Sequence, residues 1–106
     1  MNIMTESKIS VGDGATVMGY TDRYAATVIE VSKSKTRITT RRDHAKRTDT
    51  NGMSEIQTYE FSPDEHGREE TFTLRKNGKW HCKGTPLKDQ YIVVIGVRDH
   101  YFDFSF

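Results

Sequence analysis

Cysteine is nearly absent from this chain of 106 residues, and its single thiol, Cys82, excludes an internal disulfide bond. A lone free thiol is typical of proteins that work in a reducing compartment. The longest apolar run, 91–97, is far shorter than the roughly 20 residues needed to cross a bilayer. Residues 1–10 (MNIMTESKIS) lack the apolar stretch and the small-residue cleavage site of a signal peptide. We therefore expect a cytoplasmic protein with no membrane partner.

Apolar residues are also scarce, at 34% of the chain, whereas charged residues make up 29%. Such a balance approaches that of disordered proteins. The apolar residues, however, gather in short groups between turn signals. Aromatic residues make up 10% of the chain, and a core can be built from them. Because the length is close to that of a common domain, we expect one folded domain over 11–106, preceded by a mobile leader at 1–10.

Short β-like segments follow one another along the chain, and no segment has the periodicity of an amphipathic helix. The expected strands lie at 15–20, 24–32, 36–43, 56–62, 70–76, 79–83, 91–97 and 100–106. By composition, 91–97 (YIVVIGV) is a fully buried strand. The last segment alternates strictly and places Phe102, Phe104 and Phe106 on one face. This stripe is expected to anchor the C-terminus in the core.

Turn signals separate these strands. Asn77-Gly78 stands between two strands and predicts a tight hairpin of type I′, whose two central residues need positive φ. The segment 44–55 has no apolar periodicity and contains Asn51-Gly52, so it is expected to be an exposed loop. Closure hides the edges of such a sheet. The sequence therefore predicts an all-β fold, a small SH3-like or KOW-like barrel of about seven or eight short strands with long polar loops.

The net charge is only +1, but the charges are unevenly distributed. Six acids stand between 55 and 70 against one base. Between 33 and 47 one acid, Asp43, stands among seven bases. These bases are the candidate binding residues for a protein or nucleic-acid partner: Lys33, Lys35, Arg37, Arg41, Arg42, Lys46 and Arg47.

Two interpretations of the basic stretch stay open. In the first, the stretch forms a phosphate-binding face, although no aromatic residue for base stacking lies within it. Alternatively, its bases pair across the sheet with the acids of 55–70 and stabilise a solvated face, each pair contributing roughly 0.2–1 kcal/mol. The pairing interpretation is favoured. Mimicry of DNA by the acids is disfavoured, since the neighbouring bases cancel much of the negative field within about 10 Å. A surface with both signs suits docking onto a protein.

A metal site is not predicted, because no histidine or cysteine pair has the spacing of a zinc knuckle or of a helical zinc motif. His81 and Cys82 are adjacent on an expected strand and therefore face opposite sides. A zinc site assembled in three dimensions from separate strands stays open. Its ligands would come from His44, His66, His81, Cys82, His100, Asp43, Asp64 and Asp99.

Catalysis is not expected either, and no cofactor is implied. Cys82 lies on a strand beside Trp80, where a core position is the simpler interpretation. The paired acids at 64–65 and 69–70 flank a surface turn, where carboxylates are solvated rather than poised for proton transfer. Gly12-Asp13-Gly14 is too short for a phosphate-binding loop and precedes a strand rather than a helix.

Several blocks in order along the chain resemble a family of small proteins encoded by bacteriophages and prophages. They are 11–16 (VGDGAT), 21–23 (TDR) with 26–29 (ATVI), 41–43 (RRD) with Ala45, 59–61 (YEF) before Pro63, 74–80 (LRKNGKW) and 98–104 (RDHYFDF). The resemblance implies an accessory protein in the cytoplasm of a bacterial host, of the class from which anti-CRISPR proteins are drawn. It assigns no catalytic residue.

Two functions follow as expectations. The first is a non-catalytic phage-type protein that binds a host protein and inhibits or modulates it. The preferred target is a nucleic-acid-handling defence complex of the Cas9-type, bound through the bipolar face and the loop 44–55. The alternative is a basic-faced barrel that binds DNA or RNA directly through the seven bases. The free C-terminal edge leaves a homodimer open.

Overall fold

The computed structural model describes residues 9–54, 56–86 and 90–102, which hold eight strands and no helix. The strands are β1 (Gly14–Met18), β2 (Arg23–Val31), β3 (Arg37–Arg42), β4 (His44–Arg47), β5 (Tyr59–Ser62), β6 (Glu69–Leu74), β7 (Trp80–Cys82) and β8 (Ile92–Ile95). None of the described segments is a helix long and apolar enough to cross a membrane. The all-β class and the expected number of strands are confirmed.

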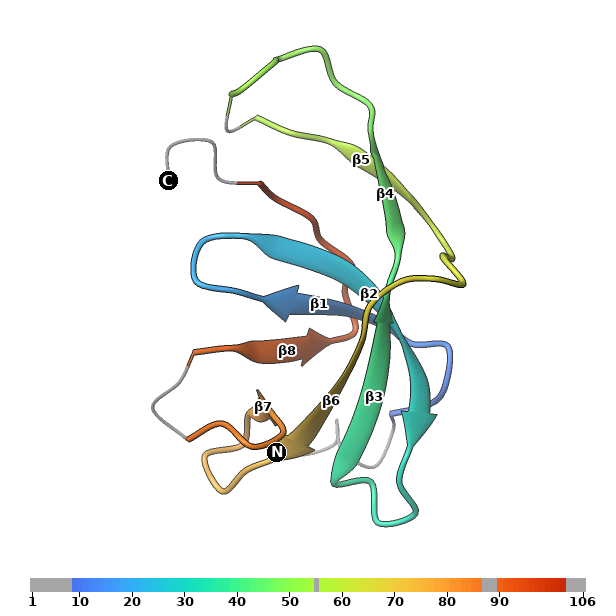
Figure 1. The fold of residues 1–106 in the computed structure, drawn as a ribbon, viewed down its shortest axis with the longest axis vertical. Helices are drawn as coiled ribbons and strands as arrows, with labels where there is room; N and C mark the ends of the chain where they lie inside the picture. Colours follow the sequence, from blue (N-terminus) through green and yellow to red (C-terminus); the bar gives the residue numbers. More distant parts are fainter. Residues whose placement is uncertain (1–8, 55, 87–89, 103–106) are drawn as a thin grey trace.

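Six of these strands close an antiparallel barrel in the order β1-β2-β3-β6-β7-β8, with β8 returning to pair with β1 (Figure 1). Apart from the closing pair of β8 and β1, the barrel strands that are sheet neighbours without being chain neighbours are β3 and β6. There Ile38 pairs with Phe72 and Arg41 with Glu69. The intervening β4 and β5 form a separate two-stranded sheet. We call β4, β5 and the described residues between them the arm.

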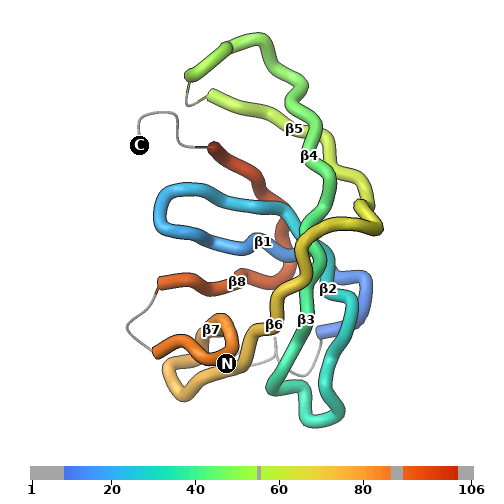
Figure 2. The backbone as a smooth tube through the Cα atoms, in the orientation of Figure 1, coloured from blue at the N-terminus to red at the C-terminus, as the bar shows by residue number. Residues whose placement is uncertain are grey.

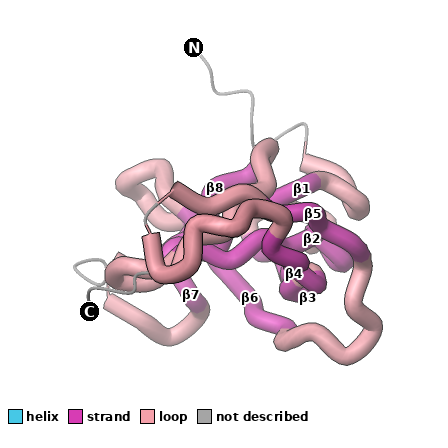
Figure 3. Tube along the Cα trace, turned by 90° about the horizontal axis from the view of Figure 1, so that it is seen from above, coloured by secondary structure: helices cyan, strands magenta, loops and turns pink. Residues whose placement is uncertain are grey.

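The arm extends from the barrel because β4 continues the direction of β3 past Asp43 (Figure 2). Seen from above, β4 and β5 lie over the side of the barrel that β2 and β3 form (Figure 3). The arm register pairs Ala45 with Phe61 and Lys46 with Glu60. A long strand thus serves two sheets, first the barrel and then the arm.

The core fills the barrel with the inward side chains of alternating strand positions, as period 2 requires. Phe72 and Ile38 are the largest fully buried side chains. Ile9 belongs to this core and is 3% exposed. The folded domain therefore begins before residue 11, and only 1–8 of the expected leader lie outside the described residues. The core comprises Ile9, Ala15, Val17, Ala26, Val28, Ile38, Phe72, Trp80 and Val93.

Two expected segments between β3 and β6 differ in the structure. The segment 44–55 is not a loop throughout, because His44–Arg47 forms β4. A two-stranded sheet needs only one backbone partner and little burial, so polar residues form it without the apolar alternation that marks a barrel strand. The strand expected at 56–62 begins only at Tyr59. The residues before Tyr59 turn at the end of the arm.

The hairpin at Asn77-Gly78 is confirmed, but its turn is not of type I′. Gly78 donates its N–H to the carbonyl of Arg75 (2.9 Å), and Arg75 donates to the carbonyl of Lys79 (3.0 Å). Gly78 has φ +83°, whereas Asn77 is not among the described residues with positive φ. These bonds describe a three-residue loop closed by a glycine bulge, which needs only one left-handed residue.

The C-terminal third is less buried than expected. On β8, Val94 is 41% exposed, and after the strand Val97 is 52% exposed. The outward face of β8 is uncovered, which composition cannot reveal. Phe102 is 48% exposed and does not anchor the core, whereas Phe104 and Phe106 lie outside the described residues.

Gly67 allows the chain to return from the arm to the barrel. A Cβ at this position would overlap the carbonyl oxygen of Arg42. We predict that Gly67→Ala lowers the free energy of unfolding by about 1–3 kcal/mol, the range for overpacked sites, as measured by urea denaturation. Gly19→Ala is the matched control, since its Cβ would meet the nearest atom at an ordinary 3.4 Å. Equal losses in the two variants would contradict the close approach.

Candidate binding surface

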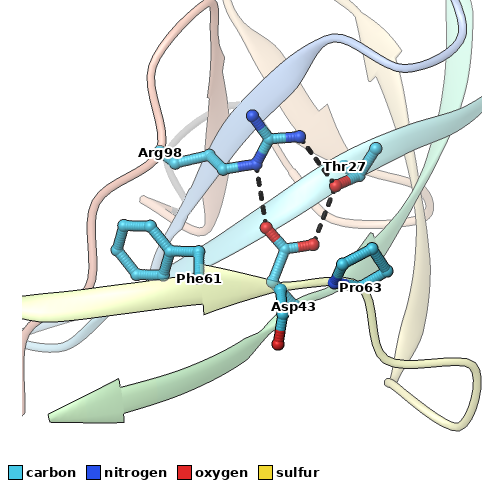
Figure 4. Close-up of a pocket in the computed structure, with 6 residues that line it drawn as sticks. Thr27, Asp43, Phe61, Pro63 and Arg98 are labelled. Atoms are coloured by element: carbon cyan, nitrogen blue, oxygen red, sulfur yellow. Dashed lines mark hydrogen bonds and ion pairs between the residues drawn. The ribbon is translucent and has the colours of Figure 1, made fainter.

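Asp43 joins the barrel to the arm (Figure 4). Its N–H donates to the carbonyl of Ala25 on β2 (2.9 Å). Its carboxylate accepts from the Thr27 hydroxyl (2.7 Å) and from Nε of Arg98 (2.9 Å). Arg98 also donates to the Thr27 oxygen (3.0 Å), which closes a three-membered network. Because the Asp43 side chain is only 4% exposed, this network fixes the direction in which the chain leaves the barrel.

A cavity of about 330 Å³ lies against this joint. The arm contributes Phe61 and Ser62 to its lining, and Pro63 follows them. Its charged lining groups, Asp43 and Arg98, neutralise one another. The cavity therefore offers no uncompensated charge to a ligand, and its network acts as a structural joint.

The C-terminal residues 98–102 hold the arm against the barrel, and we call them the strap. Gln57 of the arm donates Nε2–H to the carbonyl of Phe102 (2.8 Å), and Phe102 donates its N–H to Oε1 of Gln57 (3.1 Å). The side-chain amide thus replaces a strand partner. On its other side, the strap pairs with β2, where Tyr101 and Arg23 exchange backbone hydrogen bonds (2.9 and 3.0 Å).

Successive strap residues face the arm and β2 in turn. Arg98 and Phe102 contact the joint and Gln57, and between them the His100 ring lies 4.6 Å from the ring of Tyr59. The other residues face Arg23, which forms an ion pair with Asp99 (2.8 Å) and lies over the ring of Tyr101 (4.8 Å). The strap therefore has the alternating faces of a short strand, one toward the arm and one toward β2.

The end of the arm exposes two apolar side chains and is internally braced. Met53 is 73% exposed and Ile56 is 70% exposed, next to the residue that binds Phe102. Asp49 organises this loop by accepting from the N–H groups of Asn51 (2.9 Å) and Thr58 (2.7 Å).

Two further contacts strengthen this brace. Nε of Arg47 donates to the carboxylate of Asp49 (2.9 Å), and this bond holds the pKa of Asp49 well below its ordinary value. Asn51 donates from its side chain to the carbonyl of Ile56 (2.9 Å). The exposed apolar side chains therefore stand on a preorganised loop.

A second polar cluster joins residues of β2, β3 and β6 to Tyr91, which precedes β8. Arg42 donates to both oxygens of Glu70 (3.0 and 3.3 Å) and to the Tyr91 hydroxyl (2.8 Å), and it lies 4.0 Å from the centre of the Tyr24 ring. Tyr91 also donates to Glu70. Burial raises the pKa of Tyr91 to about 12, and the bond to Glu70 acts in the same direction. Tyr91 is therefore a neutral donor at physiological pH. The sequence did not predict this cluster, because its residues come from distant positions in the chain.

The seven candidate bases do not form one face. Arg41 and Arg42 pair with Glu69 (2.9 Å) and Glu70 (3.0 Å) on β6, and Arg47 pairs with Asp49. The pairing interpretation is confirmed for Arg41 and Arg42, although the partner strand is β6 rather than the one at 56–62. The others are spread out: Lys33 and Lys35 lie in the β2–β3 turn, Arg37 begins β3, and Lys46 lies on the arm opposite Glu60.

No group of three or more histidine, cysteine, aspartate or glutamate side chains in the described ranges is arranged to hold a metal ion. Cys82 lies on β7 and is partly buried against the core. His44 is on the arm, His66 in the turn before β6, and His81 on β7. The considered ligands therefore occupy separate elements.

Removal of the joint tests its role. Asp43→Ala leaves Arg98 and Thr27 without their acceptor, so we predict a loss of about 1–3 kcal/mol in the free energy of unfolding. Hydrogen exchange will accelerate more in β4 and β5 than in β1 and β8. The control is Glu65→Ala, a change at an exposed acid in the turn after β5. Equal acceleration in both sheets would contradict a joint that positions the arm.

Protonation of His100 is predicted to loosen the strap. Burial lowers its pKa, and the charged groups that face it are Asp22, Asp99 and Arg42, with the rings of Tyr24 and Tyr59 against it. As the pH falls, the unfolded chain binds this proton first. His100 therefore costs no stability above about pH 6.5, and stability falls below that pH by up to about 1.4 kcal/mol per unit of pKa lowering.

The measurement is urea denaturation at about pH 8 and about pH 5.5, on either side of the ordinary histidine pKa. His100→Phe keeps a ring between the two tyrosines and is expected to flatten the pH dependence. The exposed His66→Asn is expected to leave it unchanged. An unaltered profile in His100→Phe would show that another group carries the dependence.

In comparisons with known proteins, no family model, no curated protein and no solved structure matches this chain. The resemblance to phage proteins is thus neither supported nor opposed by these comparisons. The candidate surfaces are defined by the chain's own residues, namely the braced end of the arm and the charged groups of the barrel.

Proposed function

We propose that this chain is a non-catalytic binding protein that docks onto a partner protein through the end of its arm. The observation that carries the proposal is the exposure of Met53 and Ile56 on a loop that Asp49 holds in place. Apolar side chains on a projecting element are typical of the centre of a protein interface. Preorganisation lowers the entropy that ordering the loop would cost on binding.

The surroundings of these side chains suit a protein partner. Lys46 and Glu60, both exposed, stand opposite each other on the arm, so the rim carries both signs. Phe102, which Gln57 binds, adds a half-exposed aromatic ring beside the loop. An apolar centre with a mixed polar rim gives affinity from the centre and register from the rim.

The class of partner is a proposal that rests on the resemblance to phage proteins. An accessory phage protein in the cytoplasm of a bacterial host acts on host machinery, and we propose a nucleic-acid-handling defence complex of the Cas9-type as the target. Inhibition then needs no catalysis, because occupation of a functional surface is sufficient. This step is an association with a class of proteins rather than a deduction from contacts.

The alternative function, direct binding of DNA or RNA through the seven bases of 33–47, has weaker support. Three of the seven are neutralised by carboxylates. Of the rest, Lys33 and Lys35 lie in the β2–β3 turn, Arg37 begins β3, and Lys46 lies on the arm. The turn and the arm stand at opposite ends of the molecule in Figure 1. A continuous row of phosphate contacts along this stretch is therefore interrupted.

The proposal is tested by capture from host lysate with the tagged full chain and with Met53→Ser/Ile56→Ser. We predict that the wild-type chain retains one partner of fixed stoichiometry after nuclease treatment. The arm variant will bind the purified partner at least about tenfold more weakly, since each apolar side chain fully buried in an interface contributes about 1.5–3 kcal/mol.

The matched control is Val11→Ser/Val94→Ser, which removes two exposed apolar side chains from the barrel and is expected to leave binding unchanged. Circular dichroism will check that both variants keep the fold. If the arm variant binds the purified partner as tightly as the wild type, or if nuclease removes every captured protein, docking through the arm is wrong.

A further inference from the structure

The outer face of β3 and β6 combines hydroxyl groups with positive charge. Ile38 and Phe72 point into the core and are 1% and 0% exposed, so the alternate positions of both strands point outward. On β3 these include Arg37 and Thr39, and the sheet register places them opposite Thr73 and Thr71. We call Arg37, Thr39, Thr71, Thr73 and the basic residues beside them, Arg75 and Lys83, the threonine face.

The arginines of this face are not paired with described carboxylates. Within the described part of the chain, Arg37 and Arg75 are the arginines for which no ion pair with a carboxylate is found. The guanidinium of Arg75 donates to the hydroxyl of Thr73 (2.7 Å) and to the carbonyls of Thr85 (2.7 Å) and Cys82 (3.1 Å). All three acceptors are neutral. Arg75 is therefore held in place while its positive charge remains available to a ligand.

Further lysines surround the face. Lys83 donates its N–H to the carbonyl of Thr71 (2.9 Å), which places it beside that threonine. The β6–β7 turn carries the exposed Lys76 and Lys79, and the β2–β3 turn carries the exposed Lys33. A bond between Leu74 and Thr36 joins the bases of these two turns (2.9 Å), and both lie at the end of the barrel away from the arm in Figure 1.

Acids are few here. The described residues 71–86 contain no aspartate or glutamate. Glu30 lies opposite Thr39 on β2, and Glu69, at the far end of β6, is engaged by Arg41. The face therefore keeps a net positive charge although the whole chain is close to neutral.

We infer that the threonine face is a second binding surface, which contacts the phosphodiester backbone of double-stranded nucleic acid. Arginine, lysine and threonine side chains are the groups that proteins place on phosphate oxygens. The outward positions of β3 and β6 carry no apolar side chain, so the apolar centre of a protein interface is missing. They carry no aromatic ring either, so single strands find no stacking platform. Contact with the backbone alone gives binding that does not depend on base sequence.

This surface is independent of the arm. It shares Arg37, Thr39 and the neighbouring Lys33 with the basic stretch of the sequence, but it takes its remaining residues from β6, the β6–β7 turn and Lys83 after β7. Met53 and Ile56 lie in the arm, which the figures show beyond the other end of the barrel. A variant of one surface therefore leaves the other intact, and the two proposals fail separately.

The experiment is fluorescence anisotropy of a labelled duplex DNA titrated with the full chain at increasing salt. For about six phosphate contacts, affinity is expected to fall by roughly a thousandfold between 50 and 200 mM salt. Arg37→Glu/Lys83→Glu is expected to weaken binding at low salt by more than about tenfold and to lower the salt slope by about 2. The single strand of equal length will bind more weakly than the duplex.

The charge-matched control is Lys46→Glu/Arg68→Glu, which makes the same change in net charge away from the face and is expected to alter affinity less than about threefold. Arg37→Gln/Lys83→Gln provides the same test if charge reversal lowers the melting temperature. Met53→Ser/Ile56→Ser will bind the duplex as the wild type does.

Three results would overturn the inference. The first is an absence of duplex binding by the wild-type chain at low salt. The second is an equal loss in the face variant and the charge-matched control, which would show that net charge alone matters. The third is binding to phosphatidylserine vesicles as tight as binding to the duplex, which would identify a membrane surface as the ligand.

Discussion

The carboxylate of Asp43 accepts hydrogen bonds from Thr27 on β2 and from Arg98 in the strap, at the residue where β3 leaves the barrel and becomes β4. Beyond this residue the strand loses both barrel neighbours and keeps only β5. An isolated two-stranded sheet is marginally stable in water. The arm therefore depends on the barrel through a few side-chain contacts, and its orientation depends on the nearly buried Asp43 carboxylate and its bonds to Thr27 and Arg98.

Much of the barrel could be predicted because its strands bury one face. The alternation of Thr and Arg with Ile38 and Thr40 marked β3, and the Asn77-Gly78 turn marked the hairpin of β6 and β7. The arm could not be predicted, since β4 consists of His, Ala, Lys and Arg and buries little. β4 forms because it pairs with β5, and the residue pattern of β4 alone does not reveal that partner. Because β5 pairs with β4 in the arm, the strand beside β3 in the barrel is β6, and the bases of β3 pair with the acids of β6.

The strap shows how a correct pattern led to a wrong position. The described residues 98–102 form an extended segment with two different faces, whereas 103–106 of the expected strand lie outside the described residues. Those faces, however, meet the arm and Arg23 rather than the core, and Phe102 stays half exposed while Gln57 binds its backbone. Aromatic composition favoured burial, but a segment between two units packs its residues against partners that sequence periodicity cannot identify.

Charge compensation, rather than charge density, distinguishes the surfaces of this molecule. The stretch 33–47 has the most bases, yet its arginines at 41, 42 and 47 are neutralised. Arg75 and Lys83 lie in a less conspicuous region and keep their charge because the described residues 71–86 hold no acid. That local absence of acids was visible in the sequence, whereas the neutralised arginines required the fold. The exposed apolar side chains of the arm and the cationic threonine face thus occupy different elements, so a partner bound at one surface would bury no residue of the other.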